Sequence, residues 1–180
     1  MPSFLDTIKL TALIVALAMT NDSRANPENF TVHSVTGTNT FTLAAAKGRF
    51  VALHFLLKTE CPYCLRHTHE YAQKAVNDPR VVHVFLKPDP ETEIKAWAYK
   101  LGDDALKLPI YRDPDAALAK AFNIPDGYRF HGQSVHYPAL VLLDGSGKEV
   151  FRYEGKSNAD RLSYEKFSAK LEELTRPSPH

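Results

Sequence analysis

The spacing of apolar residues along the chain predicts alternating strands and helices. Short apolar runs bounded by charged or turn residues are typical of buried strands, and they occupy residues 50–57, 81–86 and 139–143. Apolar side chains at helical spacing predict four helices, over residues 62–77, 91–101, 113–122 and 158–174. Asp113 is expected to cap the third helix, with Pro114 in its first turn. Such alternation implies parallel strand pairing.

Shorter elements complete this pattern. We expect a hairpin or two short strands within residues 30–43 and a short strand at 108–111. A turn at 144–147 joins the preceding strand to a returning strand at 149–153, which adds antiparallel pairing. Residues 125–137 are polar and aromatic and are expected to form a long loop. The predicted fold class is therefore α/β, with a mixed sheet and helices on both faces.

The N-terminus carries an apolar segment of another kind. Residues 10–19 read LTALIVALAM, which is about as long as the core of a signal peptide and shorter than the roughly 20 residues of a membrane span. Lys9 precedes this run, and Ser23 and Ala25 supply small side chains for cleavage after Ala25. A cytosolic N-terminal helix or an uncleaved anchor is the alternative interpretation.

The predicted organisation follows from this segment. We expect a signal peptide over residues 1–25, one domain over residues 26–174 and a disordered tail over residues 175–180. The mature chain would then work in an exported compartment, the bacterial periplasm or the cell envelope. No stable membrane span is expected after processing.

Composition and charge narrow the function classes. The chain has 180 residues, of which 44% are hydrophobic, as in globular proteins with a substantial core. Its formal net charge of +1 argues against a broad basic surface for nucleic acid. The two cysteines, Cys61 and Cys64, are too few for a structural disulfide framework or for an ordinary structural zinc site, which has four ligands. They form either a redox pair or half of an unusual metal site.

The position of the two cysteines favours redox chemistry. They lie between a predicted strand and a helix whose first turn holds Pro62, a residue suited to that turn because its missing N–H needs no partner there. The free N–H groups and the dipole at a helix start stabilise a thiolate. Cys61 is therefore the expected nucleophile. Cys64, one turn further along, is the expected resolving residue of a redox-active disulfide.

A family resemblance rests on these same residues. The segment FVALHFLLKTECPYC resembles the strand, loop and CxxC helix of thioredoxin-like proteins, and HYPALVLLDGSGKEVFRYEG resembles their later strand pair. The segment DPDAALAKAF is similar to a helix of the exported thioredoxin and redoxin branch. The resemblance covers most of residues 30–174 and implies a thioredoxin-like fold. CPYC is also common in glutaredoxins, but this chain is longer than a minimal glutaredoxin.

The resemblance implies further site residues. By that match Pro138 is cis and lies against the disulfide, and the backbone of Tyr137 pairs with a substrate strand. Glu60 stands where a tryptophan often precedes the first cysteine, and its carboxylate opposes thiolate formation. The buried acid of thioredoxins has no clear counterpart. His54, near that position, is either a proton shuttle or, as we favour, a strand histidine satisfied by local hydrogen bonds.

Other histidines and aromatic residues are weaker candidates. His67 and His69 are expected to face solvent, with soft-metal binding by Cys64 and His67 as the alternative. His136 resembles the histidine of copper chaperones for cytochrome oxidase, which have the same fold but three residues between their cysteines. The loop at residues 128–131, together with Tyr137, forms either a substrate surface or a cover for the core.

These observations predict a thiol–disulfide oxidoreductase that exchanges the Cys61–Cys64 disulfide with exported protein substrates. No cofactor and no metal are expected, and the expected partners are protein thiols or disulfides and a redox protein that recycles the dithiol. A peroxiredoxin-like thiol peroxidase is one alternative, although its nucleophile usually follows Thr or Ser three residues earlier, where this chain has Lys58. A copper-binding chaperone of the same fold is the other.

Overall fold

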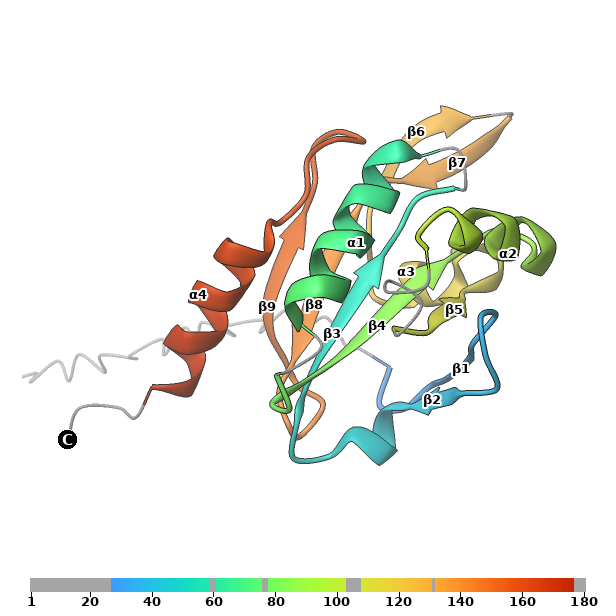
Figure 1. Cartoon of the computed structure of the whole chain (residues 1–180). Helices are drawn as coiled ribbons and strands as arrows, with labels where there is room; N and C mark the ends of the chain where they lie inside the picture. The colour runs from blue at the N-terminus through green and yellow to red at the C-terminus, as the bar shows by residue number, and fades with distance from the viewer. Residues whose placement is uncertain (1–26, 59–60, 76–77, 103–107, 131, 177–180) are drawn as a thin grey trace, which may run out of the picture.

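The computed structural model describes residues 27–58, 61–75, 78–102, 108–130 and 132–176. A five-stranded sheet runs through its centre in the order β5-β4-β3-β8-β9 (Figure 1). The strands are β3 (Phe50–Phe55), β4 (Val81–Lys87), β5 (Ile110–Arg112), β8 (Ala139–Leu143) and β9 (Glu149–Glu154). β3, β4 and β5 pair in parallel, whereas β8 pairs antiparallel with both β3 and β9. The mixed sheet of the prediction is confirmed.

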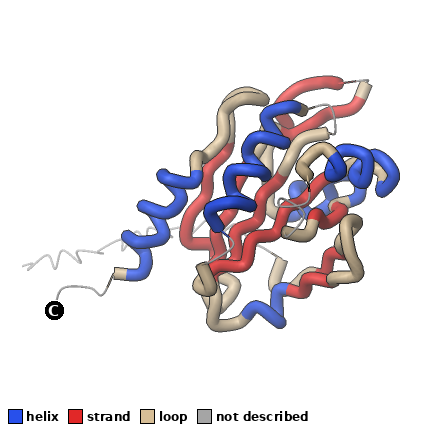
Figure 2. Tube along the Cα trace, viewed as in Figure 1, coloured by secondary structure: helices blue, strands red, loops and turns tan. Residues whose placement is uncertain are grey.

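Side chains of each central strand alternate between two apolar layers. Ala52 of β3 faces one layer and its neighbour Leu53 faces the other. The first layer is covered by α1 (Pro62–Ala75), α2 (Glu91–Tyr99) and α4 (Tyr164–Thr175). The second is covered by the 3-10 helix η1 (Leu43–Ala46), by α3 (Ala117–Ala121) and by the hairpin of β1 (Thr31–His33) and β2 (Thr40–Thr42). Helices therefore lie on both faces of the sheet, as predicted (Figure 2).

The helix predicted at 113–122 is shorter and interrupted. A 3-10 turn, η3 (Pro114–Ala116), precedes α3, and Asp115 and Ala116 have positive φ angles of 56° and 52°. Asp113 still acts as a cap, because its carboxylate accepts hydrogen bonds from the backbone N–H groups of Leu118 and Ala119 at 2.7 and 3.0 Å. Because Asp115 and Ala116 have left-handed backbone conformations, the α-helix begins at Ala117, later than the sequence pattern predicts.

Two further predictions are wrong in detail, and both changes affect the site. The segment at 125–137 is not a plain loop but a hairpin of β6 (Asp126–Phe130) and β7 (Gln133–His136). The helix predicted at 158–174 begins only at Tyr164, because Ser163 is its N-cap and accepts a hydrogen bond from the N–H of Lys166. Residues 155–163 therefore form a loop between β9 and α4.

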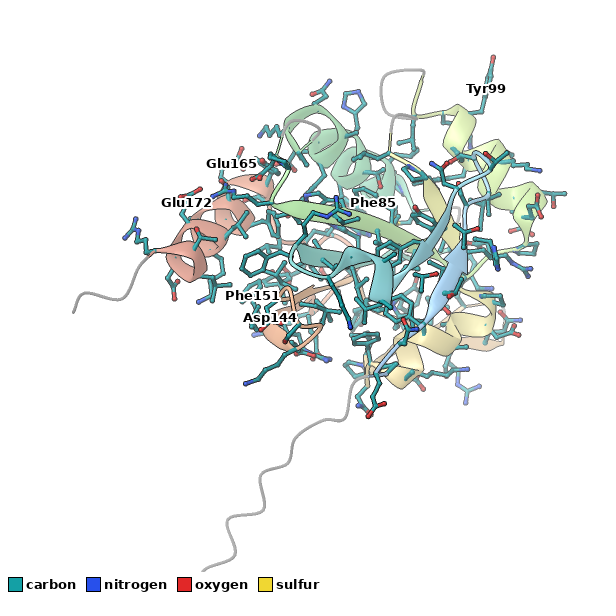
Figure 3. The ribbon with its side chains drawn as sticks, turned by 90° about the horizontal axis from the view of Figure 1, so that it is seen from below. Phe85, Tyr99, Asp144, Phe151, Glu165 and Glu172 are labelled. Carbon is teal, nitrogen blue, oxygen red and sulfur yellow. The ribbon has the colours of Figure 1, made fainter. Side chains whose placement is uncertain are left out.

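The core and the surface separate as expected for a globular chain. Trp97 and Phe85 are buried in the core, whereas Tyr99 is 84% exposed and projects away from the end of α2 (Figure 3). Within the described residues, no helix has the length and apolar character needed to cross a membrane. The predicted signal peptide at 1–25 lies outside the described residues, as does the end of the predicted tail, while Thr175 belongs to α4.

Candidate active site

The two cysteines lie where strand β3 gives way to helix α1. Pro62 is the first residue of α1, as its suitability for a first helical turn predicts. The N–H of Cys61 donates to the carbonyl of Lys58, and the N–H of Cys64 donates to the carbonyl of Cys61, both at 3.2 Å. Both residues are free thiols; Cys64 is fully buried and Cys61 is partly exposed. Only Cys61 can therefore meet a substrate first.

An arginine from a distant segment contacts both sulfur atoms. One terminal nitrogen of Arg161 lies 3.2 Å from the Sγ of Cys61 and 3.2 Å from the Sγ of Cys64. Arg161 belongs to the loop between β9 and α4, which lies beside the N-terminal end of α1 (Figure 1). A guanidinium at this distance donates a charge-assisted hydrogen bond to a thiolate.

The approach of this loop depends on a glycine. A Cβ atom on Gly155 would lie 2.2 Å from the carbonyl oxygen of Asp160 and 3.0 Å from the ring of Pro138. The N–H of Gly155 donates to the carbonyl of Pro138 at 2.8 Å. Asp160 accepts hydrogen bonds from the hydroxyl of Tyr153 and from the N–H of Lys156. The glycine thus permits the tight packing that holds the loop of Arg161 against the end of the sheet.

The surroundings give the two thiols very different pKa values. A hydrogen bond from the Cys64 thiol, together with the charge of Arg161, lowers the pKa of Cys61 from 9.0 to about 5 although burial opposes this shift. Burial raises the pKa of Cys64 well above 9.0, and its hydrogen bond to Cys61 adds to that increase. Cys61 is therefore a thiolate at neutral pH and Cys64 a thiol, as their predicted roles of nucleophile and resolving residue require.

A second cation lies beneath the dithiol. Lys87, at the end of β4, is completely buried, and its Nζ donates to the carbonyl of Leu57 at 2.5 Å and lies 4.4 Å from the ring centre of Trp97. The carboxylate of Asp89, also buried, is 3.6 Å from this ammonium group. The positive charge of Lys87 lowers the pKa of Cys64, against the larger effect of burial. Lys87 thus offsets part of the effect by which burial disfavours a Cys64 thiolate.

The bond before Pro138 corrects one prediction. No peptide bond among the described residues is cis, so the cis Pro138 expected from the family resemblance is wrong for this structure. Trans is the more stable form of an X–Pro bond by about 0.5–1 kcal/mol, and the residue types alone do not decide the isomer. Pro138 does line a small cavity with Arg161, so the structure brings it to the dithiol side of the sheet. The substrate-binding roles of Tyr137 and Pro138 stay predictions.

Three buried histidines form a hydrogen-bonded chain behind the site. Nδ1 of His54 lies 3.0 Å from Nε2 of His67, and Nε2 of His54 lies 3.0 Å from Nδ1 of His83. His54 is thus satisfied by local hydrogen bonds, as we favoured, and no contact with either sulfur is seen. His67 does not face solvent as expected, because it lies on the buried face of α1, whereas His69 is exposed. We call His54, His67 and His83 the histidine chain.

Burial keeps the histidine chain neutral. It lowers the pKa of His67 from 6.5 to about 3 and that of His83 to about 4, and the charge of Arg161 adds to the effect on His67. The pKa of His54 is also well below 6.5, first through burial and then through its two histidine neighbours. A neutral imidazole donates from one nitrogen and accepts at the other. The two hydrogen bonds of the histidine chain can therefore run in the same direction, with each ring donating to the next.

The remaining candidates lie apart from the sulfurs. His136 is buried, and its Nδ1 donates to the carbonyl of Tyr137 at 2.8 Å. It lines a cleft of about 700 Å³ whose lining includes neither cysteine. Within the described ranges, no three His, Cys, Asp or Glu side chains are arranged to hold a metal ion. Glu60 lies outside the described residues.

Sequence reasoning missed Arg161 and Lys87. Arg161 fell inside a predicted helix, and 97 residues separate it from Cys64 in the chain. Lys87 directly follows an apolar strand, where a charged residue usually marks the return to solvent. A lysine at the end of a mostly buried strand, just before a Pro-Asp-Pro loop, is a weak signal. Only the folded contacts identify its partners.

Comparison with solved structures supports the fold. A peroxiredoxin-like protein from Aquifex aeolicus is 13% identical, with a TM-score of 0.67 over 81% of this chain and 83% of that one. A secreted disulfide oxidoreductase from Mycobacterium tuberculosis, homologous to Escherichia coli DsbE, is 20% identical, with a TM-score of 0.60 over 81% and 96%. The exposed lipoprotein thioredoxin Etrx1 from Streptococcus pneumoniae is 26% identical, with a TM-score of 0.59 over 81% and 99%.

Sequence comparison defines the family. A search of the curated proteins found no significant match. The model of the AhpC/TSA family matches residues 24–150, which is more than half of the chain and includes both cysteines. With the dithiol at the start of α1, the chain is a thioredoxin-fold oxidoreductase that belongs to the AhpC/TSA family.

Proposed function

We propose that this protein is a thiol–disulfide oxidoreductase that exchanges the Cys61–Cys64 disulfide with protein substrates. The observation that carries the proposal is the contact of Arg161 with both sulfurs, at 3.2 Å each. Because this cation contacts both sulfurs, it stabilises a thiolate on either one. An exposed nucleophile and a buried partner three residues later provide the two positions that disulfide exchange needs.

The proposed exchange has two steps. The Cys61 thiolate attacks one sulfur of a substrate disulfide, and a mixed disulfide forms while the other substrate sulfur leaves as a thiolate and takes a proton from solvent. Cys64 then loses its proton and attacks the Sγ of Cys61, which closes the Cys61–Cys64 disulfide and releases the second substrate thiol. Two electrons pass to the substrate. The same steps in reverse oxidise a substrate dithiol.

Matched cysteine variants test this function. Cys61→Ser should abolish the reduction of insulin disulfides, because serine supplies no nucleophile for the first step. Cys64→Ser should still form the mixed disulfide and should accumulate it as a covalent adduct, visible by mass spectrometry, since release needs the second thiol. Insulin reduction by Cys61→Ser at the wild-type rate would defeat the proposal, provided that circular dichroism shows both variants folded.

A peroxidase is the second candidate, and the family match favours it. AhpC/TSA and a peroxiredoxin-like neighbour both point to reduction of peroxides, and a thiolate beside an arginine suits attack on an O–O bond. Against it, Lys58 stands where a Thr or Ser usually precedes the peroxidatic cysteine. Stopped-flow mixing of the reduced protein with hydrogen peroxide decides between the two. We expect a slow reaction without saturation, as for a free thiol.

The proposal includes an exported compartment. It is supported by the apolar run at residues 10–19 and by the small residues before position 26. The Mycobacterium tuberculosis neighbour is described as secreted and the pneumococcal one as exposed. N-terminal sequencing of the protein from a periplasmic fraction should give Asn26 as the first residue. A cytosolic protein that retains residues 1–25 would refute this part alone.

A further inference from the structure

A small pocket opens directly beside the nucleophile. It measures about 140 Å³, and its described lining consists of Lys58, Cys61, Pro62, Tyr63, Tyr128, Phe130 and Asn158. Three of these residues are aromatic, and Tyr63 is one of two large apolar side chains that the described surface exposes. Lys58 is the one basic side chain of that lining, and its Nζ donates to the side-chain oxygen of Gln133 at 2.6 Å. The pocket is therefore mainly apolar next to Cys61.

The β6–β7 hairpin builds one wall of this pocket. Tyr128 and Phe130 are two residues apart on β6, so they share a face. Their cross-strand partners on that face are Val135, which is buried, and Gln133, which holds Lys58. The wall is thus tied through Lys58 to the segment that leads into the dithiol.

A second attachment fixes the hairpin to the loop before β8. The ring of Tyr128 stacks on that of Tyr137, with centroids 5.7 Å apart and planes at 24°. A Cβ atom on Gly127 would lie 2.7 Å from both the ring and the backbone nitrogen of Tyr137, so glycine is needed for this approach. The aromatic wall is therefore held on two sides, by the dithiol segment and by the loop of Tyr137.

The chemistry of the reaction determines what enters the pocket. In the mixed disulfide a substrate sulfur lies about 2.05 Å from the Sγ of Cys61. The residues next to the substrate cysteine must then lie against the walls of the pocket that contains Cys61. Pockets for drug-sized ligands measure roughly 300–1,000 Å³, so a pocket of about 140 Å³ has room for a single side chain. A mainly aromatic and apolar lining favours an apolar one.

We propose that the aromatic wall of β6 selects polypeptide substrates that carry an aromatic or aliphatic residue next to the reacting cysteine. The inference rests on the proposed exchange function and names its substrate class. Phe130 and Tyr128 act as specificity residues, because they contact the flanking side chain and not the reacting sulfurs. The hairpin, which no strand of the central sheet pairs with, is the element that gives this protein its preference.

The experiment compares two peptide disulfides that differ only beside the cysteine, with Phe in one and Ser in the other. The ratio of their kcat/KM values measures the preference. We expect the full-length protein to favour the Phe peptide about tenfold, the effect of partly burying one aromatic side chain. Phe130→Ala should bring the ratio close to one, and Phe130→Tyr should keep it. Tyr99→Ala, which removes an exposed ring at the end of α2, is the matched control and should keep both rate and ratio.

The outcomes separate this inference from the proposed function. If the wild-type protein reduces both peptides at equal rates, or if Phe130→Ala keeps the tenfold ratio, the aromatic wall selects nothing and the inference is wrong while the exchange function stands. If the protein reduces neither peptide nor insulin, the exchange function itself fails. Loss of the ratio in both Phe130→Ala and Phe130→Tyr would mean that the hairpin has moved, which also contradicts selection by the ring.

Discussion

Two polar groups near the start of α1, Cys61 and His67, are held in opposite charge states. At the start of the helix, Cys61 is partly exposed and is paired with the cation of Arg161, which favours its charged form. Six residues later, nearly two turns along, His67 is buried and hydrogen-bonded to another imidazole, and burial favours its uncharged form. Both groups have pKa values below their ordinary range, and the charge of Arg161 contributes to both shifts, but the leading cause is a hydrogen bond from Cys64 for the thiol and burial for the imidazole.

This contrast shows why a direction of pKa shift does not identify a role. For a thiol, a lower pKa means more of the reactive anion at neutral pH. For a histidine, a lower pKa means that the ring stays neutral and becomes a weaker base, so the histidine chain is poorly suited to take a proton from Cys64. We therefore assign chemistry to the dithiol with Arg161 and packing to the histidine chain.

The largest expected effect is acid destabilisation through the histidine chain. The folded pKa values of His67 and His83, about 3 and about 4, lie below the unfolded value of 6.5, so the unfolded chain binds protons first as the pH falls. Stability should be complete well above pH 6.5 and should fall as the pH drops from 6.5 to about 3, by about 2 kcal/mol at pH 5 for each histidine that stays neutral. Urea unfolding at pH 7, 6 and 5 measures this. Equal stability at pH 7 and pH 5 would contradict a neutral buried chain.

A somewhat smaller effect is expected from breaking the chain at its centre. His54→Leu leaves Nε2 of His67 and Nδ1 of His83 without their partner, and each unpaired buried group costs about 1–3 kcal/mol. The free energy of unfolding at pH 7 should fall by about 2–4 kcal/mol in urea. His69→Leu, on the exposed side of α1, is the control and should change the free energy of unfolding by less than about 0.5 kcal/mol. Similar losses in the two variants would mean that the hydrogen bonds contribute little.

The smallest effect is expected at the dithiol and Arg161. Arg161→Met removes a cation next to Cys61 and should raise the pKa of that thiol by about one unit, measured by the absorbance of the thiolate at 240 nm. One unit equals about 1.4 kcal/mol and should make the reduction potential more negative by roughly 30 mV. Arg49→Met, an exposed arginine at the start of β3, is the control. An unchanged Cys61 pKa in Arg161→Met would show that the arginine does not stabilise the thiolate.

The sequence predicted those parts of the fold and site that depend on neighbours along the chain. The strands of the mixed sheet follow from apolar runs, and the location of Cys61 at a helix start follows from Pro62. Arg161 and the histidine chain depend on contacts between segments up to 100 residues apart, which no local pattern encodes. The same reason explains the hairpin of β6 and β7, where aromatic residues alternate with polar ones and Gly127 is needed for a tertiary approach.

The contact of one arginine nitrogen with two sulfurs gives each redox state its own electrostatic surface. In the dithiol form, the cation of Arg161 is balanced by the thiolate of Cys61. When the disulfide closes, that anion disappears and the same cation is left unbalanced beside a partly exposed sulfur. The oxidised protein is then one unit more positive at its entrance than the reduced protein. A protein with an acidic docking surface would therefore bind the oxidised form more tightly than the reduced form.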